Sequence, residues 1–311
     1  MNVFIVGANG FIGKNIVEYL NLNYNHKLFS PNSLELNLLN KTDIDNYITS
    51  NKIDIIIYAA NKGGGRDENY QISNVLEINL RMSFNILNQS DKVDKIIYLG
   101  SGAEYGKHKP IINAKEADSV SLPLDEYGLY KFICSKYAEN SKNIYHLRIF
   151  GVYGKYERYK AGFVSNAIVK NLIGMPIEIM QDVYFDYIYV KDLVKIIAYF
   201  IGHEGKYKIY NATTGEKINI VSIAKIINEV SNYKSEIPIK NPCLNFEYTS
   251  DNERIRKEIK TITFTPHSSA IRELYNYYSS TLDTLDIDGI KSDSLINFIK
   301  INKNQHSEKI Y

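Results

Sequence analysis

The chain has 311 residues, of which 44% are hydrophobic and 23% charged, and this ordinary composition excludes a collagen-like repeat, a disulfide scaffold and a wholly disordered chain. Lysine and arginine total 37 and aspartate and glutamate 35, so the net charge of +2 gives no electrostatic footprint for nucleic acid or an acidic membrane. The two cysteines, Cys134 and Cys243, lack metal-ligand spacing. We expect a cytoplasmic protein, because the first residues lack the charged region of a signal peptide and no segment has the roughly 20 apolar residues of a membrane span.

The first 150 residues alternate between short apolar runs and longer amphipathic runs. The short runs are apolar at consecutive positions, as in strands buried on both faces, and they lie at 3–6, 54–60, 95–100 and 145–150, with a weaker candidate at 26–30. The runs between them follow the helical period, and they lie at 11–22, 42–50, 75–87 and 126–140. This alternation predicts an α/β fold with a doubly wound parallel sheet and helices on both of its faces.

The pattern becomes less regular after residue 150. Helical periods recur there, interrupted by prolines, at 190–201, 220–230 and 270–278. We expect residues 1–160 to form the sheet domain, with 184–212 returning to it, and residues 161–282 to form most of a smaller C-terminal substrate-binding domain. The polar tail, residues 283–311, favours a loosely packed end, with a subunit contact as the alternative.

A glycine-rich turn joins the first predicted strand to the first predicted helix. It reads Gly7-Ala8-Asn9-Gly10-Phe11-Ile12-Gly13. In such a turn Gly7 permits the tight bend, Gly10 a close approach to a pyrophosphate, and Gly13 close packing of helix on strand. The helix N-terminus offers unpaired N–H groups and a positive dipole end to the phosphates. The spacing is one residue wider than the usual fingerprint, but its position predicts a Rossmann-type dinucleotide site.

The end of the second strand bears on the choice between NAD and NADP. An acid at this place binds the ribose hydroxyls and selects NAD. Residues 29–33 read Phe-Ser-Pro-Asn-Ser, without an acid and without an arginine to hold a 2′-phosphate. We therefore expect NADP as the cofactor, with NAD as the alternative.

Reduction of a carbonyl group by hydride transfer needs a proton donor beside the carbonyl oxygen. A tyrosine serves when a cation lowers its pKa, and a lysine four residues later on a helix shares its face. Such pairs occur at Tyr58/Lys62, Tyr105/Lys109, Tyr127/Lys131, Tyr156/Lys160 and Tyr187/Lys191. Chance alone gives about two or three such matches, but only Tyr127/Lys131 opens a long predicted helix. Ser101 follows the strand at 95–100, at the strand end where parallel sheets bind ligands. We therefore expect Ser101, Tyr127 and Lys131 to be catalytic.

Taken together, these motifs resemble the extended short-chain dehydrogenases/reductases of the nucleotide-sugar epimerase/dehydratase family. The resemblance spans roughly residues 1–280. It is carried by the glycine turn, Tyr58-Ala59-Ala60, the Gly-Ser-Gly-Ala-Glu-Tyr-Gly segment at 100–106, the Tyr127/Lys131 pair and the segment 186–193. Within the family, residues 34–39 and 59–64 are most similar to GDP-fucose synthase, which epimerises a GDP-4-keto-6-deoxy sugar at C3 and C5 and then reduces C4 with NADPH.

The resemblance implies the family's triad roles for Ser101, Tyr127 and Lys131. It implies cofactor contacts at Gly7, Asn9, Gly10, Phe11, Ile12, Gly13, Asn37, Leu38, Ala59, Ala60 and Asn79, besides Tyr127 and Lys131. It implies substrate contacts at Ser101, Gly102, Ala103 and Lys170, although a solvated helix face is the alternative for Lys170. Family members often pair through the helix that carries the tyrosine, so a homodimer is expected. No metal site is expected, and none of the six histidines is assigned a role.

Several positions depart from the family pattern. Dehydratases carry an Asp-Glu pair where this chain has Gly102 and Ala103, so dehydration is not expected. GDP-fucose synthase epimerises with a Cys at the place of Ala103 and a His at the place of Gly162. An Arg that grips the substrate diphosphate and an Asn of a turn are replaced by Phe185 and Gly151. Epimerisation therefore loses its acid/base groups, and hydride transfer to C4 remains.

These observations predict an NADPH-dependent reductase of the C4 keto group of a nucleotide-linked, GDP-type 4-keto-6-deoxy hexose or heptose. C3/C5 epimerase activity, a nucleic-acid partner and a membrane partner are not expected. One alternative is a C4 epimerase that retains NAD and oxidises, then reduces, the same carbon. The other is a non-catalytic dinucleotide-binding protein, because a fold does not fix a function.

Overall fold

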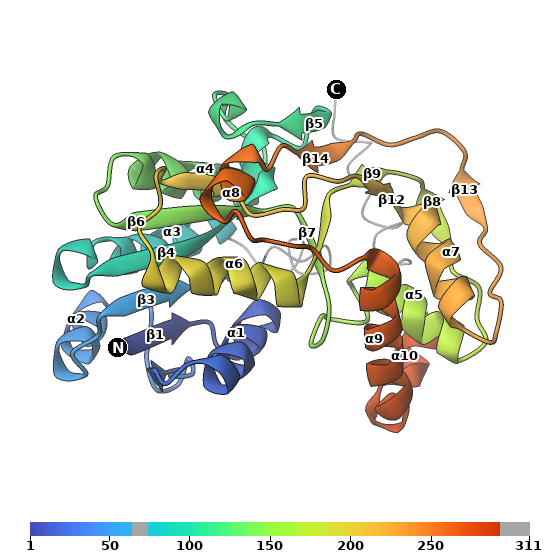
Figure 1. Cartoon of the computed structure of the whole chain (residues 1–311), viewed down its shortest axis with the longest axis horizontal. Coiled ribbons are helices and arrows are strands. Elements are labelled where there is room, and N and C mark those ends of the chain that lie inside the picture. Colours follow the sequence, from blue (N-terminus) through green and yellow to red (C-terminus); the bar gives the residue numbers. More distant parts are fainter. Residues whose placement is uncertain (64–73, 293–311) are drawn as a thin grey trace.

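A parallel sheet of six strands occupies the centre of the computed structural model, which describes residues 1–63 and 74–292 (Figure 1). The strand order is β11-β6-β4-β3-β1-β2, and all neighbours pair in parallel. The strands are β1 (Asn2–Val6), β2 (Lys27–Phe29), β3 (Ile55–Tyr58), β4 (Lys95–Ser101), β6 (Ile144–Ile149) and β11 (Ile209–Asn211). The predicted α/β fold with a Rossmann-type parallel sheet is confirmed.

Consecutive residues of β1 face opposite sides of this sheet. Val3 and Ile5 pack into the first core, with α1 and α6, whereas Phe4 and Val6 pack against the opposite face of the sheet, with α2, α3 and α4. Because both faces are covered, every position from Val3 to Val6 is apolar, which is the pattern seen in the sequence. The helices are α1 (Phe11–Asn23), α2 (Lys41–Ser50), α3 (Val75–Leu87), α4 (Glu126–Glu139) and α6 (Val190–Gly202).

The predicted elements of the first 150 residues are confirmed to within a few residues. The strand predicted at 54–60 ends earlier, at Tyr58, so Ala59 and Ala60 lie in the loop that follows it. The weak candidate at 26–30 is the edge strand β2. Among the described residues no helix has the length and apolar character needed to cross a membrane.

A second group of elements has its own apolar core (Figure 1). Its helices are α5 (Phe163–Leu172), α7 (Ile220–Val230), α9 (His267–Ser280) and α10 (Ile287–Lys291). Short strand pairs flank them: β7 (Gly151–Tyr153) with β10 (Tyr187–Tyr189), and β8 (Ile179–Gln181) with β13 (Ile239–Asn241). The short helix α8 (Glu253–Glu258) packs beside β11, which returns this part of the chain to the large sheet.

A small four-stranded sheet lies between the large sheet and the second group of elements (Figure 1). Its order is β12-β9-β14-β5, and its strands are β12 (Ile218–Asn219), β9 (Tyr184–Phe185), β14 (Tyr248–Ser250) and β5 (Ile111–Ala114). β5 comes from the segment directly after β4, whereas β14 comes from far along the chain. This sheet therefore brings the late residue Tyr248 beside the end of β4.

The beginning of the C-terminal tail is folded. Leu285, Ile287 and Ile290 pack into the second core, and Ile290 is 2% exposed. The prediction of a loosely packed end is therefore wrong for residues 283–292, because three closely spaced apolar side chains of this stretch pack into that core. Residues 293–311 lie outside the described residues.

Candidate functional site

The glycine-rich turn is packed so tightly that two of its glycines admit no side chain. Gly7 has a φ of +84°, and a Cβ there would lie 2.7 Å from the backbone nitrogen of Ala60. A Cβ on Gly13 would lie 2.2 Å from the carbonyl oxygen of Gly7. Gly10 is the N-cap of α1, and no side chain of the described residues caps this helix. The first-turn amides and the positive end of the α1 dipole are therefore available to an anion.

A cavity of about 370 Å³ opens beside this turn. Its walls come from the turn, the segment after β2, the loop after β3 and α3, and include Gly7, Asn9, Gly10, Asn32, Ser33, Asn37, Leu38, Ala60, Asn61 and Lys62. Six residues expected at the cofactor line it, namely Gly7, Asn9, Gly10, Asn37, Leu38 and Ala60. Lys62 is a cationic wall residue to which the sequence analysis gave no role.

Seven other residues expected at the cofactor are not among those that line the cavity; two of them, Tyr127 and Lys131, lie on α4 and are described below with Ser101. Phe11 packs against the second core, whereas Ile12 and Ala59 pack against the first. Gly13 packs against the turn, because its backbone lies so close to Gly7 that a Cβ there would collide with the Gly7 carbonyl oxygen. Asn79 is fully buried, and its amide binds both the N–H and the carbonyl oxygen of Lys62, at 2.9 and 2.7 Å. In this structure Asn79 therefore holds a wall of the cavity in place.

Ser101, Tyr127 and Lys131 converge at the carboxyl end of β4. Ser101 is the last residue of that strand, and its hydroxyl lies beside the Tyr127 phenol, whose pKa it lowers against the effect of burial. Asp125 caps α4 by accepting a hydrogen bond from the N–H of Gly128 at 2.7 Å, which fixes where Tyr127 enters the helix. One turn later, the Lys131 ammonium donates to the carbonyl oxygen of Leu99 at 2.6 Å. The structure thus brings together the three residues predicted to be catalytic.

The protonation of this group differs from the expectation in one respect. Burial raises the pKa of Tyr127 above its ordinary value, although the Ser101 hydroxyl opposes the shift. Burial lowers the pKa of Lys131 to about 8. Lys131 is not among the groups that shift the pKa of Tyr127, because its ammonium is turned to the Leu99 carbonyl and to the rings of Tyr98 and Tyr130. The expected lowering of the Tyr127 pKa by Lys131 is therefore wrong for this structure, and Tyr127 carries its proton at neutral pH.

A buried carboxylate lies directly behind Ser101. Glu104 is fully buried, and its Oε1 accepts hydrogen bonds from the N–H of Ser101 at 2.9 Å and from the His146 ring at 2.7 Å. Its Oε2 accepts from Nε of Arg148 at 2.7 Å. Burial by itself raises the pKa of Glu104, but His146 and Arg148 hold this pKa at about 2.

The partners of Glu104 extend to the helix that carries the tyrosine. Arg148 donates from its other nitrogens to Tyr105, to the carbonyl of Glu116 and to the hydroxyl of Ser135 on α4. Burial lowers the pKa of His146, so we assign it as neutral, donating from Nε2. Its Nδ1 has no partner among the described residues. This network couples the end of β4 to α4 through buried charges.

The sequence analysis missed this network, although a signal was present. His146 and Arg148 alternate within the apolar run at 145–150, so they share one face of a buried strand. Buried cations require an anionic partner. The only nearby acid in the 100–106 segment is Glu104.

The positions that depart from the family pattern are filled in specific ways. Ala103 is fully buried, and Gly102 has no room for a side chain, because a Cβ there would lie 2.6 Å from the hydroxyl oxygen of Tyr248. Phe185 packs on the rings of Tyr187 and Tyr248. A Cβ on Gly162 would collide with the carboxyl group of Glu157. Burial raises the pKa of this carboxyl to about 7, and the hydroxyl of Ser165 donates to it.

Lys170 lies on α5 and is 2% exposed. The alternative that it belongs to a solvated helix face is therefore wrong. A contact of Lys170 with substrate stays a prediction.

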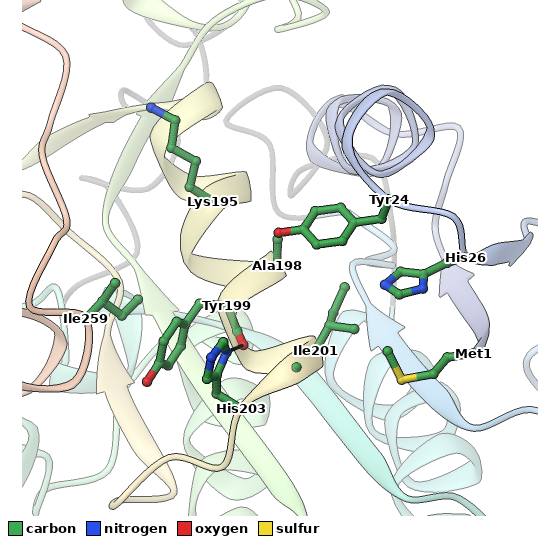
Figure 2. A pocket seen from close by; sticks show the side chains of 10 residues that line it. Met1, Tyr24, His26, Lys195, Ala198, Tyr199, Ile201, His203 and Ile259 are labelled. Atoms are coloured by element: carbon green, nitrogen blue, oxygen red, sulfur yellow. Dashed lines mark hydrogen bonds between the residues drawn. The ribbon is translucent and has the colours of Figure 1, made fainter.

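A second cavity, of about 290 Å³, lies far from these residues, between the start of the chain and α6 (Figure 2). It is lined in part by two stacked pairs, Tyr24 with His26 and Tyr199 with His203. None of the residues expected at the cofactor or the substrate is among its ten lining residues. It is thus separate from the convergence at Ser101.

The chain is similar to a known protein family and to several of its characterised members. The model of the NAD dependent epimerase/dehydratase family matches residues 3–213. GDP-L-colitose synthase of Yersinia pseudotuberculosis is 27% identical over 262 residues, which cover 75% of this chain and 83% of that protein. ADP-L-glycero-D-manno-heptose-6-epimerase of Brachyspira hyodysenteriae is 31% identical over 268 residues, which cover 75% and 81%.

A solved structure shares the fold over almost the whole chain. GDP-mannoheptose C4 reductase of Campylobacter jejuni, solved with NADP bound, superposes with a TM-score of 0.75 at 19% identity. The superposition covers 89% of this chain and 98% of that one.

Proposed function

Since the chain belongs to the NAD dependent epimerase/dehydratase family, we propose that it is an NADPH-dependent reductase of the C4 keto group of a GDP-linked 4-keto-6-deoxy hexose or heptose. The observation that carries this proposal is the convergence of Ser101, Tyr127 and Lys131 at the end of β4. The names of two similar proteins, a GDP-L-colitose synthase and a GDP-mannoheptose C4 reductase, support a GDP-sugar and reduction at C4.

The residues of the glycine turn fit a dinucleotide. Side chains at Gly7 and Gly13 are sterically excluded, so backbone lines this wall of the cavity, and the uncapped start of α1 favours a pyrophosphate there. Asn37, Leu38 and Ala60 are placed to hold the remainder of the cofactor. When bound, NADPH supplies the hydride that reduces C4.

The side chains of the triad supply the proton and the orientation. Tyr127 is protonated at neutral pH, because its pKa is raised, so its phenol can give a proton to the C4 oxygen as hydride reaches C4. Ser101 donates a hydrogen bond to the same oxygen and aligns the carbonyl group. We assign Lys131 to the cofactor, where its ammonium would bind the nicotinamide ribose, as the family resemblance implies. The C=O double bond becomes an alcohol, with the hydride on carbon and the proton on oxygen.

The neutral wall after β2 favours NADP over NAD. Asn32 and Ser33 line the cavity, and no acid is present at residues 29–33. The carboxylate of Glu35 accepts the N–H of Asn32 at 2.8 Å and is not among the residues that line the cavity, so the lining residues after β2 offer no acid to bind the ribose hydroxyls of NAD.

We also propose that C3/C5 epimerisation does not accompany the reduction. Gly102 and Ala103 offer no acid/base group beside Ser101. At Gly162 the neighbouring titratable group is Glu157, which is engaged by Ser165. Reaction in D2O tests this point, because epimerisation would place solvent deuterium at C3 or C5 of the product.

The proposed function is tested with purified protein, NADPH and a panel of keto-sugar nucleotides that differ in base and in sugar length. We expect consumption of NADPH, seen as loss of its absorbance, with a GDP-linked 4-keto-6-deoxy sugar, at one equivalent per product. Consumption with none of the panel would contradict the proposal.

A C4 epimerase that retains NAD is the second candidate; the relative at 31% identity is named as an epimerase, although one that acts at C6 of a heptose. Such an enzyme starts by taking a proton onto Tyr127, which requires a phenolate, and the raised pKa of Tyr127 disfavours that form. Purified protein that carries tightly bound NAD and needs no added cofactor would favour the epimerase. The expected homodimer stays a prediction.

A further inference from the structure

A second tyrosine reaches the catalytic serine from a distant part of the chain. Tyr248 begins β14, the strand that lies between β5 and β9 in the small sheet. Its ring packs on Phe150, with the centroids 4.6 Å apart, and meets the edge of Phe185 at 5.7 Å. Tyr248 is 8% exposed, so these contacts fix the direction of its side chain. That direction brings its hydroxyl against Gly102 and beside the Ser101 side chain, which lowers the pKa of Tyr248 against the effect of burial.

The absence of a side chain at residue 102 makes room for this hydroxyl. A Cβ on Gly102 would lie 2.6 Å from the hydroxyl oxygen of Tyr248, closer than two such atoms can approach. The ammonium of Lys107 lies over the rings of both Tyr248 and Tyr127, at 5.2 and 5.8 Å from their centroids. Tyr127 and Tyr248 therefore flank one serine and share one cation.

The donor and acceptor positions of the Ser101 hydroxyl define the role that is open to Tyr248. A serine hydroxyl donates one hydrogen bond and accepts two. The N–H of Ala103 donates to the Ser101 oxygen at 3.1 Å, which fills one of the two acceptor positions. If the Tyr248 hydroxyl donates to the second acceptor position of the Ser101 oxygen, both acceptor positions are filled. The Ser101 O–H then donates to the Tyr127 oxygen or to a substrate carbonyl.

The acidities of the two phenols agree with this division of roles. Burial raises the pKa of both Tyr127 and Tyr248 above the ordinary value of a tyrosine. Both phenols therefore keep their protons at neutral pH, and each can donate a hydrogen bond.

We propose that Tyr248 is a positioning residue of the reaction site, which donates to Ser101 and thereby directs the Ser101 hydroxyl onto the keto oxygen of the substrate. This inference rests on the proposed function for the identity of that oxygen. It accounts for the empty position at Gly102 and for the place of β14 beside the end of β4.

The first test is a double-mutant cycle with Tyr248→Phe and Ser101→Ala, which measures NADPH consumption with the keto-sugar nucleotide. Tyr248→Phe should lower kcat about tenfold, with a KM change of less than about twofold, since one neutral hydrogen bond to Ser101 is lost. In the Ser101→Ala background the same substitution should have no further effect on kcat, because Tyr248 acts through Ser101. Tyr184→Phe, which removes a hydroxyl from the neighbouring strand β9, is the matched control and should leave kcat unchanged.

Two outcomes of the cycle would overturn the inference. One is an unchanged kcat in Tyr248→Phe, and the other is an equal loss with and without the Ser101 hydroxyl, which would indicate a structural role. An inactive wild-type protein would instead contradict the proposed function.

The second test needs no substrate and therefore stands if the proposed function fails. The pKa of Tyr127 is followed by NMR titration of tyrosine labelled with 13C at Cζ, in the wild type and in Tyr248→Phe. Loss of the Tyr248 hydroxyl frees an acceptor position on Ser101, which then accepts from the neutral Tyr127 phenol, so the pKa of Tyr127 should rise. An unchanged or lower pKa of Tyr127 in Tyr248→Phe would overturn the inference.

Discussion

The two sides of Ser101 are built from different chemistry. Behind it lies the ion pair of Glu104 and Arg148 with neutral His146, all fully buried. In front of it lie the two neutral phenols of Tyr127 and Tyr248. Both sides act on the same residue: Glu104 accepts a hydrogen bond from the Ser101 N–H, and the two phenols lie beside the Ser101 hydroxyl.

This difference separates the groups that hold Ser101 in position from the groups that act with its hydroxyl in the reaction. A buried carboxylate with a guanidinium partner is costly to disturb, because removal of either leaves an uncompensated charge. A neutral hydroxyl exchanges one hydrogen-bond partner for another at little cost. We therefore assign the position of Ser101 to the charged side and the chemistry to the hydroxyl side.

The largest effect is expected from a substitution on the hydroxyl side of Ser101. Tyr127→Phe removes the proton donor, so kcat should fall by about 10²–10⁴-fold. The change is measured by NADPH consumption at saturating keto-sugar nucleotide, with NADPH binding followed separately by fluorescence. Tyr137→Phe, on the exposed face of the same helix, is the control and should keep full activity. Retention of activity by Tyr127→Phe would refute the assignment of the proton donor.

On the charged side, the expected effect is on folding stability. Glu104→Gln leaves Arg148 without its anionic partner, so the free energy of unfolding should fall by about 3–5 kcal/mol, measured by urea denaturation. Glu139→Gln breaks an exposed ion pair with Lys136 and should cost no more than about 1 kcal/mol.

The dependence of the free energy of unfolding on acidic pH gives a second test of Glu104. The folded pKa of Glu104, about 2, lies below its ordinary value of 4.5. Its contribution to stability is therefore complete above about pH 4.5 and is lost as the pH falls toward 2. Glu104→Gln should flatten this part of the curve, whereas an identical acid loss in the variant would assign it to other carboxylates.

The dependence of the rate on alkaline pH tests Lys131. With a pKa of about 8, Lys131 loses its charge above that pH, and kcat/KM should then decline by up to about tenfold per pH unit. In Lys131→Arg the charge persists, so a lower but flatter profile is expected. The same decline in both proteins would show that another group titrates.

The smallest expected effect concerns the cofactor. Asn32 lines the cavity, and its side chain accepts from the N–H groups of Leu34 and Glu35, which an aspartate would also do. Asn32→Asp therefore adds a charge with little change of shape, and it should weaken NADPH about tenfold relative to NADH. Equal changes in the dissociation constants of the two would place the 2′-phosphate elsewhere.

The sequence predicted the hydrophobic side of this architecture better than its polar side. Consecutive apolar residues in β1 and β4 report burial on both faces, and the glycine spacing reports the tight turn, because Gly13 packs directly on Gly7 within the same segment. The role of Glu104 was missed, since a single acid after Ser101 gains meaning only when Arg148 is seen beside it. Tyr248 was also missed, because β14 has three residues and no period, and its approach to Ser101 depends on strand pairing with β5. The burial of Lys170 and the packing of Ile290 are likewise tertiary effects.

The central claim, reduction at C4 without epimerisation, is tested most directly by following the transferred hydrogen. The protein is incubated with a GDP-4-keto-6-deoxy sugar and NADPH deuterated at the nicotinamide C4, and the product is examined by NMR. The account predicts one deuterium at C4 of the sugar, and, in the reverse labelling with D2O and unlabelled NADPH, no deuterium on carbon. Deuterium absent from C4 in the first experiment, or present at C3 or C5 in the second, would contradict it.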